Sequence, residues 1–290
     1  MSNNMTNNSW TTSGRGERAL LWILGGFTAA AVAGFWIFGV HPERIAANPL
    51  AARVYGAAFV VFARGQVLLA AAALIIVLVR RAGTAWISAF VAIYVLSLAS
   101  ELSGTTVGLP FGPYHYTDGL GPKWFGHVPV LIPLSWFLMA VPSFAIARRL
   151  AGTSSNAVSR ILIGSFVLLS WDLALDPAMS HATKYWIWGD GATGPYYGMP
   201  WLNLFGWYVT GVALMIVLEA RHAGVWLDAI PIRWLAGFYV ANLALSLGID
   251  AAAGLSGAVV ASLIPIAACV IALRGSAGGM AIARTPVGAP

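Results

Sequence analysis

Three carboxyl groups at the edges of apolar runs are the residues of this chain best suited to chemistry. Glu101 follows the run FVAIYVLSLAS, and Asp172 and Asp176 lie four residues apart in LLSWDLALDPAMS, which places both on one face of a helix. A carboxylate at membrane depth is costly unless it is paired, protonated or in contact with water. These residues are therefore predicted to donate or accept protons. The structural alternative is that they pair with Arg64 or cap helix ends.

Aromatic side chains crowd around these acids, in FGPYHYTDGLGPKWFGHVP (111–129) and WIWGDGATGPYYGMPW (186–201). Aromatic faces stabilise a desolvated cation by about 2 kcal/mol, and they offer flat walls to a conjugated or isoprenoid ligand. An interfacial aromatic belt explains any single ring equally well. Asn203 is expected to hydrogen-bond a water or a carboxyl group, with helix–helix contact as the alternative. The candidate substrate-binding residues are Tyr114, Tyr116, Trp136, Trp171, Trp188, Tyr196, Tyr197, Asn203 and Trp207.

Metal and nucleotide chemistry have little support in the sequence. His115, His127 and His181 form no HxxxH or HExxH pair, and the single cysteine, Cys269, lies in an apolar run, so no metal site is predicted. There is no phosphate-binding glycine loop. The net charge of +6 is spread over short loops, which favours contact with anionic lipid headgroups over nucleic acid.

The composition is that of a polytopic membrane protein. Of the 290 residues, 59% are hydrophobic and 9% charged, whereas soluble domains carry roughly 25% charged residues. Several apolar runs approach the ~20 residues that span a bilayer. We predict an all-α bundle of about eight transmembrane helices, with seven as the alternative count. The expected spans are 19–40, 54–78, 85–100, 128–147, 161–175, 201–218, 234–247 and 252–273, with a turn at 248–250 between the last two.

Basic residues predict the orientation. Eleven arginines fall on one side of these spans and four lysines or arginines on the other, so the positive-inside rule puts both termini in the cytoplasm. No cleavable signal peptide is expected. We expect an integral protein of the bacterial inner membrane, with a polar tail over 1–18, one transmembrane domain over 19–274 and a C-terminal tail over 275–290. Its aromatic loops, 101–128 and 176–200, would lie outside.

The two aromatic regions also resemble each other. Gly112-Pro113-Tyr114 recurs as Gly194-Pro195-Tyr196, and a proline precedes a tryptophan by seven positions at Pro129 and Trp136 and again at Pro200 and Trp207. Each loop follows an acid-bearing helix. A parallel internal repeat accounts for this pattern, and so does the general enrichment of glycine, proline and aromatic residues at membrane interfaces.

The combined motifs resemble those of the CruF-type carotenoid hydratases, in the wider carotenoid-biosynthesis membrane family. E-x-x-G-T-x-x-G-x-P-F-G-x-Y-x-Y and G-x-V-P-V-x-I-P-L-x-W run from Glu101 to Trp136. W-D-x-x-x-D-P-x-M, W-x-W and G-x-Y-Y-G-x-P-x-x-N-x-x-G-W run from Trp171 to Trp207. The resemblance implies hydration of a terminal carbon–carbon double bond of an acyclic carotenoid, without a redox cofactor. It also implies carotenoid, water and membrane lipid as partners, and other carotenoid-biosynthesis enzymes as candidate partners.

Three other functions remain open from the residues alone. A carotenoid-binding or carrier protein would need the aromatic residues but not the acids. A transporter would use the acids as a proton relay, although the spans have little polarity besides Arg64. A metal-dependent carotenoid-cleaving enzyme would need the histidine pairs that the sequence lacks.

Overall fold

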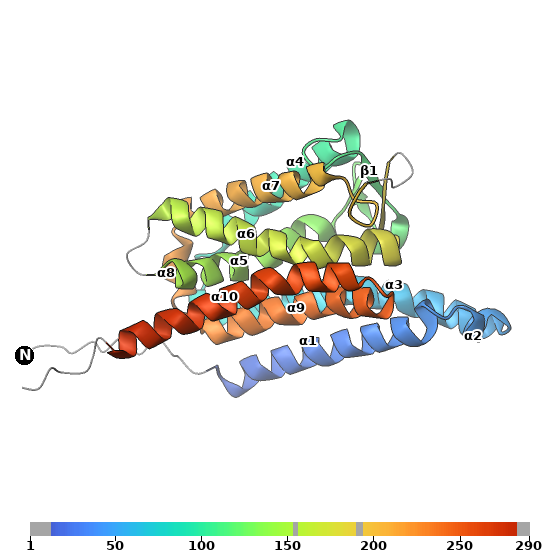
Figure 1. Cartoon of the computed structure of the whole chain (residues 1–290), viewed down its shortest axis with the longest axis horizontal. Coiled ribbons are helices and arrows are strands. Elements are labelled where there is room, and N and C mark those ends of the chain that lie inside the picture. Colours follow the sequence, from blue (N-terminus) through green and yellow to red (C-terminus); the bar gives the residue numbers. More distant parts are fainter. Residues whose placement is uncertain (1–12, 153–155, 190–193, 283–290) are drawn as a thin grey trace, which may run out of the picture.

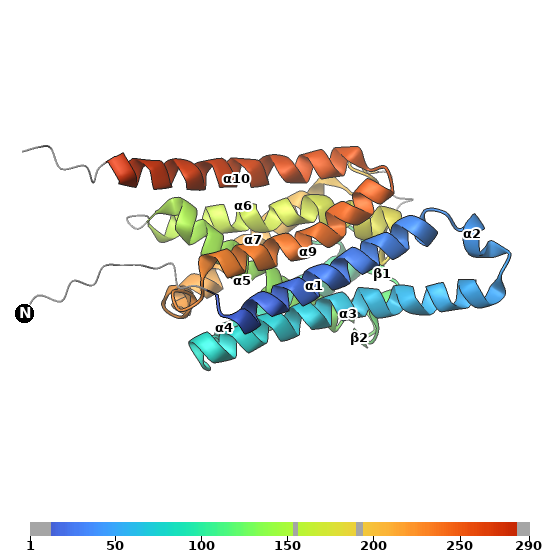
Figure 2. The same cartoon turned by 90° about the horizontal axis from the view of Figure 1, so that it is seen from below.

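Eight long helices make up the bundle in the computed structural model of the chain, which describes residues 13–152, 156–189 and 194–282 (Figures 1 and 2). Residues 1–12 of the expected N-terminal tail and 283–290 of the expected C-terminal tail lie outside the described residues. The long helices are α1 (Arg15–Gly34), α3 (Pro49–Ala82), α4 (Ile87–Val107), α5 (Leu131–Ala151), α6 (Ala157–Asp176), α7 (Trp201–Ala220), α9 (Ile232–Ala252) and α10 (Ser256–Ile282).

Short elements connect them. The π-helical turns η1 (Phe35–Gly39) and η3 (Pro177–Ala182) extend α1 and α6, and the helices α2 (Glu43–Ala46) and α8 (Ala223–Leu227) lie in connections. The linker after α4 holds β1 (Tyr114–Tyr116), the 3₁₀ turn η2 (Asp118–Leu120), β2 (Lys123–Trp124) and β3 (Val128–Pro129). The linker after α6 holds β4 (Trp186–Trp188).

The fold is an all-α polytopic membrane bundle, as predicted. Seven helices in the described part of the chain are long and apolar enough to cross a membrane, and α10 adds an apolar segment at Ser256–Ala268. Large apolar side chains cover the outside, among them Trp22 (80% exposed) and Ile264 (64% exposed). Such a surface suits lipid, because a helix satisfies its own backbone hydrogen bonds and needs no water at its flanks.

Two errors in the predicted boundaries moved an acid. The third span was predicted to end at residue 100, but α4 continues to Val107, so Glu101 lies inside the helix. The turn predicted at 248–250 is helical, and α9 ends at Ala252. Gly248 serves close packing instead, since a Cβ there would lie 2.5 Å from a methyl of Val32 in α1. Asp250 is consequently buried within a helix.

Ion pairs tie the helices together at one end of the bundle, which we call the basic end. Arg81 of α3 contacts Glu17 of α1 at 2.6 Å, and the Trp234 indole of α9 donates to the Glu17 carbonyl at 2.8 Å. α3 and α5 also end in arginine pairs here. α1 begins and α10 ends at this end, whereas the strands lie at the opposite one, the strand end (Figures 1 and 2).

The predicted orientation can be tested with two exposed acids, Asp118 at the strand end and Asp228 beside α8, whose side chains are 98% and 70% exposed. In a Cys269→Ala background, we expect a membrane-impermeant maleimide to label Asp118→Cys in intact cells. Asp228→Cys should react only after lysis. The reverse pattern would invert the orientation.

Candidate active site

A two-stranded sheet gathers aromatic side chains at the strand end. β1 and β4 pair antiparallel, with Tyr114 opposite Trp188 and Tyr116 opposite Trp186. Side chains alternate along a strand, so these four rings point together into the bundle and are buried, whereas those of His115 and Ile187 point outward and are exposed. The sheet therefore closes the strand end of the bundle with a layer of hydrogen-bond donors.

Glu101 accepts three hydrogen bonds, two of them from this sheet. The hydroxyls of Tyr114 and Tyr116 both donate to Oε2, the latter at 2.8 Å, and the Trp136 indole of α5 donates to Oε1 at 2.8 Å. Gly104, one turn further along α4, makes room for the rings, since a Cβ there would lie 2.9 Å from the Tyr114 ring. Glu101 is 4% exposed, so these protein donors take the place of most of its contact with bulk water.

Asp176 and Asp172 form a second carboxyl cluster on α6. The indoles of Trp186 and Trp188 donate to Asp176 Oδ1 at 2.7 and 3.2 Å. The Asn203 amide of α7 donates to Oδ2 of Asp172 at 3.1 Å and to Oδ2 of Asp176 at 3.3 Å. Both acids are buried, and Asp172 Oδ1 has no hydrogen-bond partner within the described part of the chain.

Three tryptophans lie between the two clusters. Trp136 and Trp207 stack with ring centroids 4.0 Å apart, and Trp171 meets Trp207 edge-on at 5.8 Å. Offset-stacked and edge-on contacts of this kind are favourable, and they hold large π faces next to the carboxyl groups.

The arrangement supports an internal repeat. In the units α4–β1–α5 and α6–β4–α7, the first helix supplies an acid, and the strand and second helix supply donors. Trp136 and Trp207, each seven residues after its proline, stack face to face. One predicted equivalence was wrong: β1 pairs with the strand Trp186–Trp188, whereas Gly194 to Met199 form a separate bridged turn.

An apolar cavity of about 490 Å³ opens beside these groups, within the usual range of roughly 300–1,000 Å³ for small-molecule sites. It runs from the carboxyl clusters between α1, α3 and α9, and reaches the surface at Phe38 (37% exposed) and Val54 (60% exposed). The predicted site residues on its wall are Glu101, Tyr114, Tyr116, Trp136, Trp171, Asp176, Trp188, Asn203 and Trp207.

Three predicted residues lie off this wall. Asp172 sits behind it and reaches Asp176 through Asn203. Tyr196 donates to the Leu173 carbonyl at 2.7 Å, and Tyr197 packs against Tyr196 and His181. Neither tyrosine lines the cavity: Tyr196 holds its turn against α6, and the Tyr197 hydroxyl lies beside Gly257 of α10.

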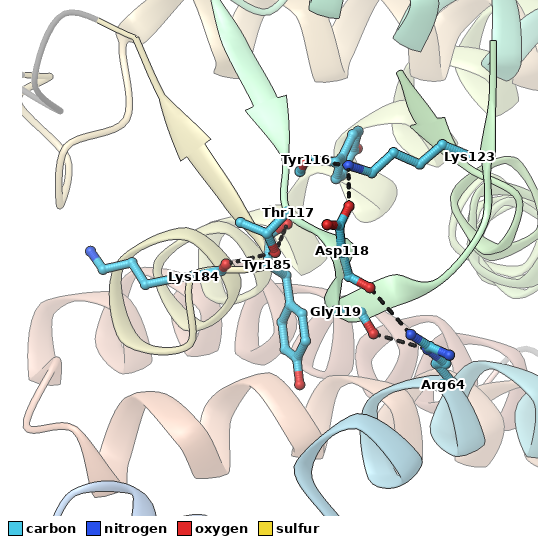
Figure 3. A network of polar contacts seen from close by, with 8 residues as sticks. All are labelled: Arg64, Tyr116, Thr117, Asp118, Gly119, Lys123, Lys184 and Tyr185. Atoms are coloured by element: carbon cyan, nitrogen blue, oxygen red, sulfur yellow. Dashed lines mark hydrogen bonds and ion pairs between the residues drawn. The ribbon is translucent and has the colours of Figure 1, made fainter. Parts of the chain in front are cut away.

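Arg64 does not pair with the acids, contrary to one of the two structural alternatives for them. Its guanidinium donates to the carbonyls of Gly119 at 3.0 Å and Asp118 at 3.2 Å (Figure 3). Lys123 donates to the Tyr116 carbonyl and to the Asp118 carboxylate, both at 2.8 Å, and this hydrogen bond lowers the pKa of Asp118. Arg64 and Lys123 thereby fix the turn that follows β1.

The partners of each acid determine which protonation state it can hold. An indole N–H can only donate, whereas a tyrosine hydroxyl both donates and accepts. Asp176 has two indoles and an amide as donors, an arrangement suited to a carboxylate. Glu101 Oε2 has only tyrosine partners, so Glu101 can also carry a proton there. Burial, and secondarily the charge of Glu101, hold the pKa of the Tyr114 and Tyr116 phenols well above the ordinary value.

Sequence reasoning overlooked two residues at this site. Trp186 was considered only as an interfacial ring, although the alternation in W-x-W would place it beside Trp188. Asp250 was assigned to a turn. The three outer histidines are exposed, and the described residues contain no group of three or more His, Cys, Asp or Glu side chains placed to hold a metal.

Comparison with known proteins assigns a family. Residues 62–269 match the carotenoid biosynthesis protein family, so the chain belongs to it. It is 31% identical over 183 residues to the bisanhydrobacterioruberin hydratase of Haloarcula japonica, a match that covers 62% of this chain and 57% of that relative. The chain thus spans little more than half the length of the curated relative it matches. No solved structure matches it.

The Asp176 cluster gives a stability prediction. Asp176→Leu leaves the buried indoles of Trp186 and Trp188 without an acceptor, whereas the Asn203 amide keeps Asp172. Each unsatisfied donor costs about 1–3 kcal/mol, so we expect the detergent-solubilised protein to lose at least about 2 kcal/mol of unfolding free energy. Asp176→Asn keeps one acceptor oxygen and should lose less. Thermal unfolding followed by tryptophan fluorescence measures both, and equal melting temperatures for the two variants would contradict this hydrogen-bond arrangement.

Proposed function

We propose that this member of the carotenoid biosynthesis protein family is a hydratase, which adds water to the terminal double bond of an acyclic carotenoid and forms a tertiary alcohol. The observation that carries the proposal is the pair of acids on the cavity wall. The hydrogen-bond partners of Glu101 allow its carboxyl group to be protonated, whereas those of Asp176 suit the carboxylate form. The hydratase name of the Haloarcula japonica relative supports the same reaction class.

Glu101 is the proton donor in this proposal. Protonated on Oε2, it transfers the proton to the less substituted carbon of the double bond, and the π electrons form the new C–H bond. The carboxylate left behind accepts hydrogen bonds from Tyr114, Tyr116 and Trp136. Because these donors are already in place, the charge that develops on Glu101 is stabilised without reorganisation.

The tryptophans stabilise the carbocation. Protonation leaves a positive charge on the tertiary carbon, and the faces of Trp136, Trp171 and Trp207 line the adjoining wall. A desolvated cation–π contact is worth about 2 kcal/mol or more. The same rings exclude bulk water, which limits competing loss of a proton from the cation.

Asp176 completes the reaction as the base. A water attacks the tertiary carbon through an oxygen lone pair and loses a proton to Asp176, so the product gains one H₂O and no electrons are exchanged. The proton gained by Asp176 then returns to Glu101. Tyr116 is suited to carry it, because its phenol bonds Glu101 and its strand partner Trp186 bonds Asp176. Asp172 and Asn203 orient Asp176 from behind.

The substrate enters from the lipid in this account. The cavity meets the surface between η1 and α3, where its lining residues Phe38 and Val54 face outward. A carotenoid dissolved in the bilayer could insert its end group there while the rest of the chain stays in lipid. We place the protein in the bacterial inner membrane with the strand end outside and 19–274 as one domain. Membrane lipid, and other enzymes of carotenoid biosynthesis, are its proposed partners.

Expression in a carotenoid-accumulating bacterial host tests the reaction. We expect pigments heavier by one or two waters in mass spectra of extracts, across a panel of acyclic carotenoids. Glu101→Gln cannot donate the proton and should lower the hydrated fraction at least about 100-fold, the usual contribution of a general acid. Glu219→Gln, which alters an acid paired with Arg160 at the basic end, is the matched control and should retain activity.

A carotenoid carrier is the alternative outcome of that experiment. Folded wild-type protein that co-purifies with pigment, but yields no hydrated product from any member of the panel, would refute the hydratase proposal. Hydrated product that persists in Glu101→Gln would instead refute Glu101 as the acid.

Two matched substitutions on α3 test the proposed access route of the substrate. Val54 and Val61 are 60% and 61% exposed, but only Val54 lines the cavity. We expect Val54→Trp to lower the hydrated fraction several-fold by narrowing the opening, and Val61→Trp to leave it unchanged. Equal effects of the two substitutions would place the access route elsewhere.

A further inference from the structure

Three buried polar side chains of α6 and α9 lack partners for some or all of their polar atoms. Within the described ranges, no protein group bonds Oδ1 of Asp172, the hydroxyl of Ser246 or either carboxyl oxygen of Asp250. Asp172 and Asp250 are fully buried, and Ser246 is 1% exposed. Buried polar groups in proteins are nearly always hydrogen-bonded, either to protein or to ordered water.

The helix register places these three residues at similar depth in the bundle. α6 and α9 both start at the basic end and run the same way, and the Tyr239 hydroxyl of α9 donates to the Val167 carbonyl of α6 at 2.7 Å. Equal rise along the two helices then places Ser246 at the level of Ala174, between the two acids of α6. Asp250 follows one turn later, at the level of Ala178.

The surroundings of Tyr196 place Asp250 there independently. Burial raises the pKa of the Tyr196 phenol, and the carboxyl groups of Asp250, Asp172 and Asp176 raise it further. The Tyr196 hydroxyl itself donates to the Leu173 carbonyl on α6. Asp250 of α9 therefore lies near the part of α6 that carries Asp172 and Asp176.

We propose that Asp172, Ser246 and Asp250 bind a small cluster of ordered water that feeds the cavity, an inference that rests on the proposed hydratase function. A buried water makes about three hydrogen bonds, and these side chains offer acceptors for them. Asp172 and Asp250 lie behind the cavity wall, whereas Ser246 is part of it, as is Asp176. Water held behind the wall can pass Ser246 and reach the base.

A bound water cluster would supply the reactant water that the apolar cavity itself holds poorly. Its wall is mostly apolar and aromatic, so a free water gains little by resting beside the double bond. A carotenoid end group filling the cavity would also displace any loosely held water. Water bound behind Asp176 stays available while the substrate is in place, and its acceptors orient an oxygen lone pair toward the cavity.

X-ray radiolysis of the detergent-solubilised full chain tests the cluster without relying on activity. Radiolysis generates hydroxyl radicals from water, and these oxidise neighbouring side chains even when the water is internal. The reporters are Trp171, whose indole lacks a protein partner among the described groups, and Met199, which contacts Asn203. The controls, Trp234 and Met215, are as deeply buried and lie away from the cluster.

We expect the reporters to be oxidised at least about tenfold faster than the controls. Asp250→Leu should displace the water and bring the reporters to the rate of the controls, whereas Asp250→Asn, which still binds water, should stay near wild type. Reporters as slow as the controls in the wild-type protein would overturn the proposal.

The hydratase activity of the Asp250 variants provides a second, independent test of the water cluster. The hydrated pigment fraction should fall at least about tenfold in Asp250→Leu and recover in Asp250→Asn, with co-purified substrate pigment unchanged in both. If the reporters of the wild-type protein are oxidised but no hydrated product forms, the water cluster is supported and the proposed hydratase function is refuted. Normal hydration in Asp250→Leu, with its reporters protected, would refute the role of the cluster as the water supply.

Discussion

The high cost of burying a carboxyl group in a membrane protein without partners organises the strand end of this bundle. A carboxylate there must gain from protein groups what it loses from water. Glu101 and Asp176 meet that requirement through phenols, indoles and one amide, which come from β1, β4, α5 and α7. The aromatic loops are therefore structural partners of the acids. The same contacts set which acid can hold a proton and which is suited to the carboxylate form.

The internal repeat explains how one chain obtains two acids with different properties. Each unit presents a helix-borne carboxyl group to a strand and a following helix, and the two strands pair. The donors, however, have diverged: tyrosines in β1 and tryptophans in β4. A phenol can exchange donor and acceptor roles whereas an indole cannot. In the proposed mechanism, that one difference in residue type separates the proton donor from the base, beside a cavity lined by Trp136 and Trp207.

Much of this site could be predicted from the sequence, because scarce acids and clustered aromatic residues stand out in an apolar chain. Runs of apolar residues identified the helices, and the motif that runs from Glu101 to Trp136 contains Tyr114 and Tyr116. Pairing between distant segments could not be predicted. The register of β1 with β4 depends on how α4 and α6 pack, and the motif match Gly112-Pro113-Tyr114 with Gly194-Pro195-Tyr196 pointed to a different alignment. Asp250 was missed because Gly248 suggests a turn locally and serves helix packing in the structure.

The central claim is that the protein adds the elements of water across a carbon–carbon double bond by protonating carbon first. Isotope labelling tests this most directly: membranes containing the protein are incubated with an acyclic carotenoid in D₂O enriched in ¹⁸O, and the product is analysed by mass spectrometry. We predict one ¹⁸O in the new hydroxyl and one deuterium on the adjacent carbon for each hydrated end. Product oxygen that does not come from water, or an adjacent carbon without deuterium, would contradict the account.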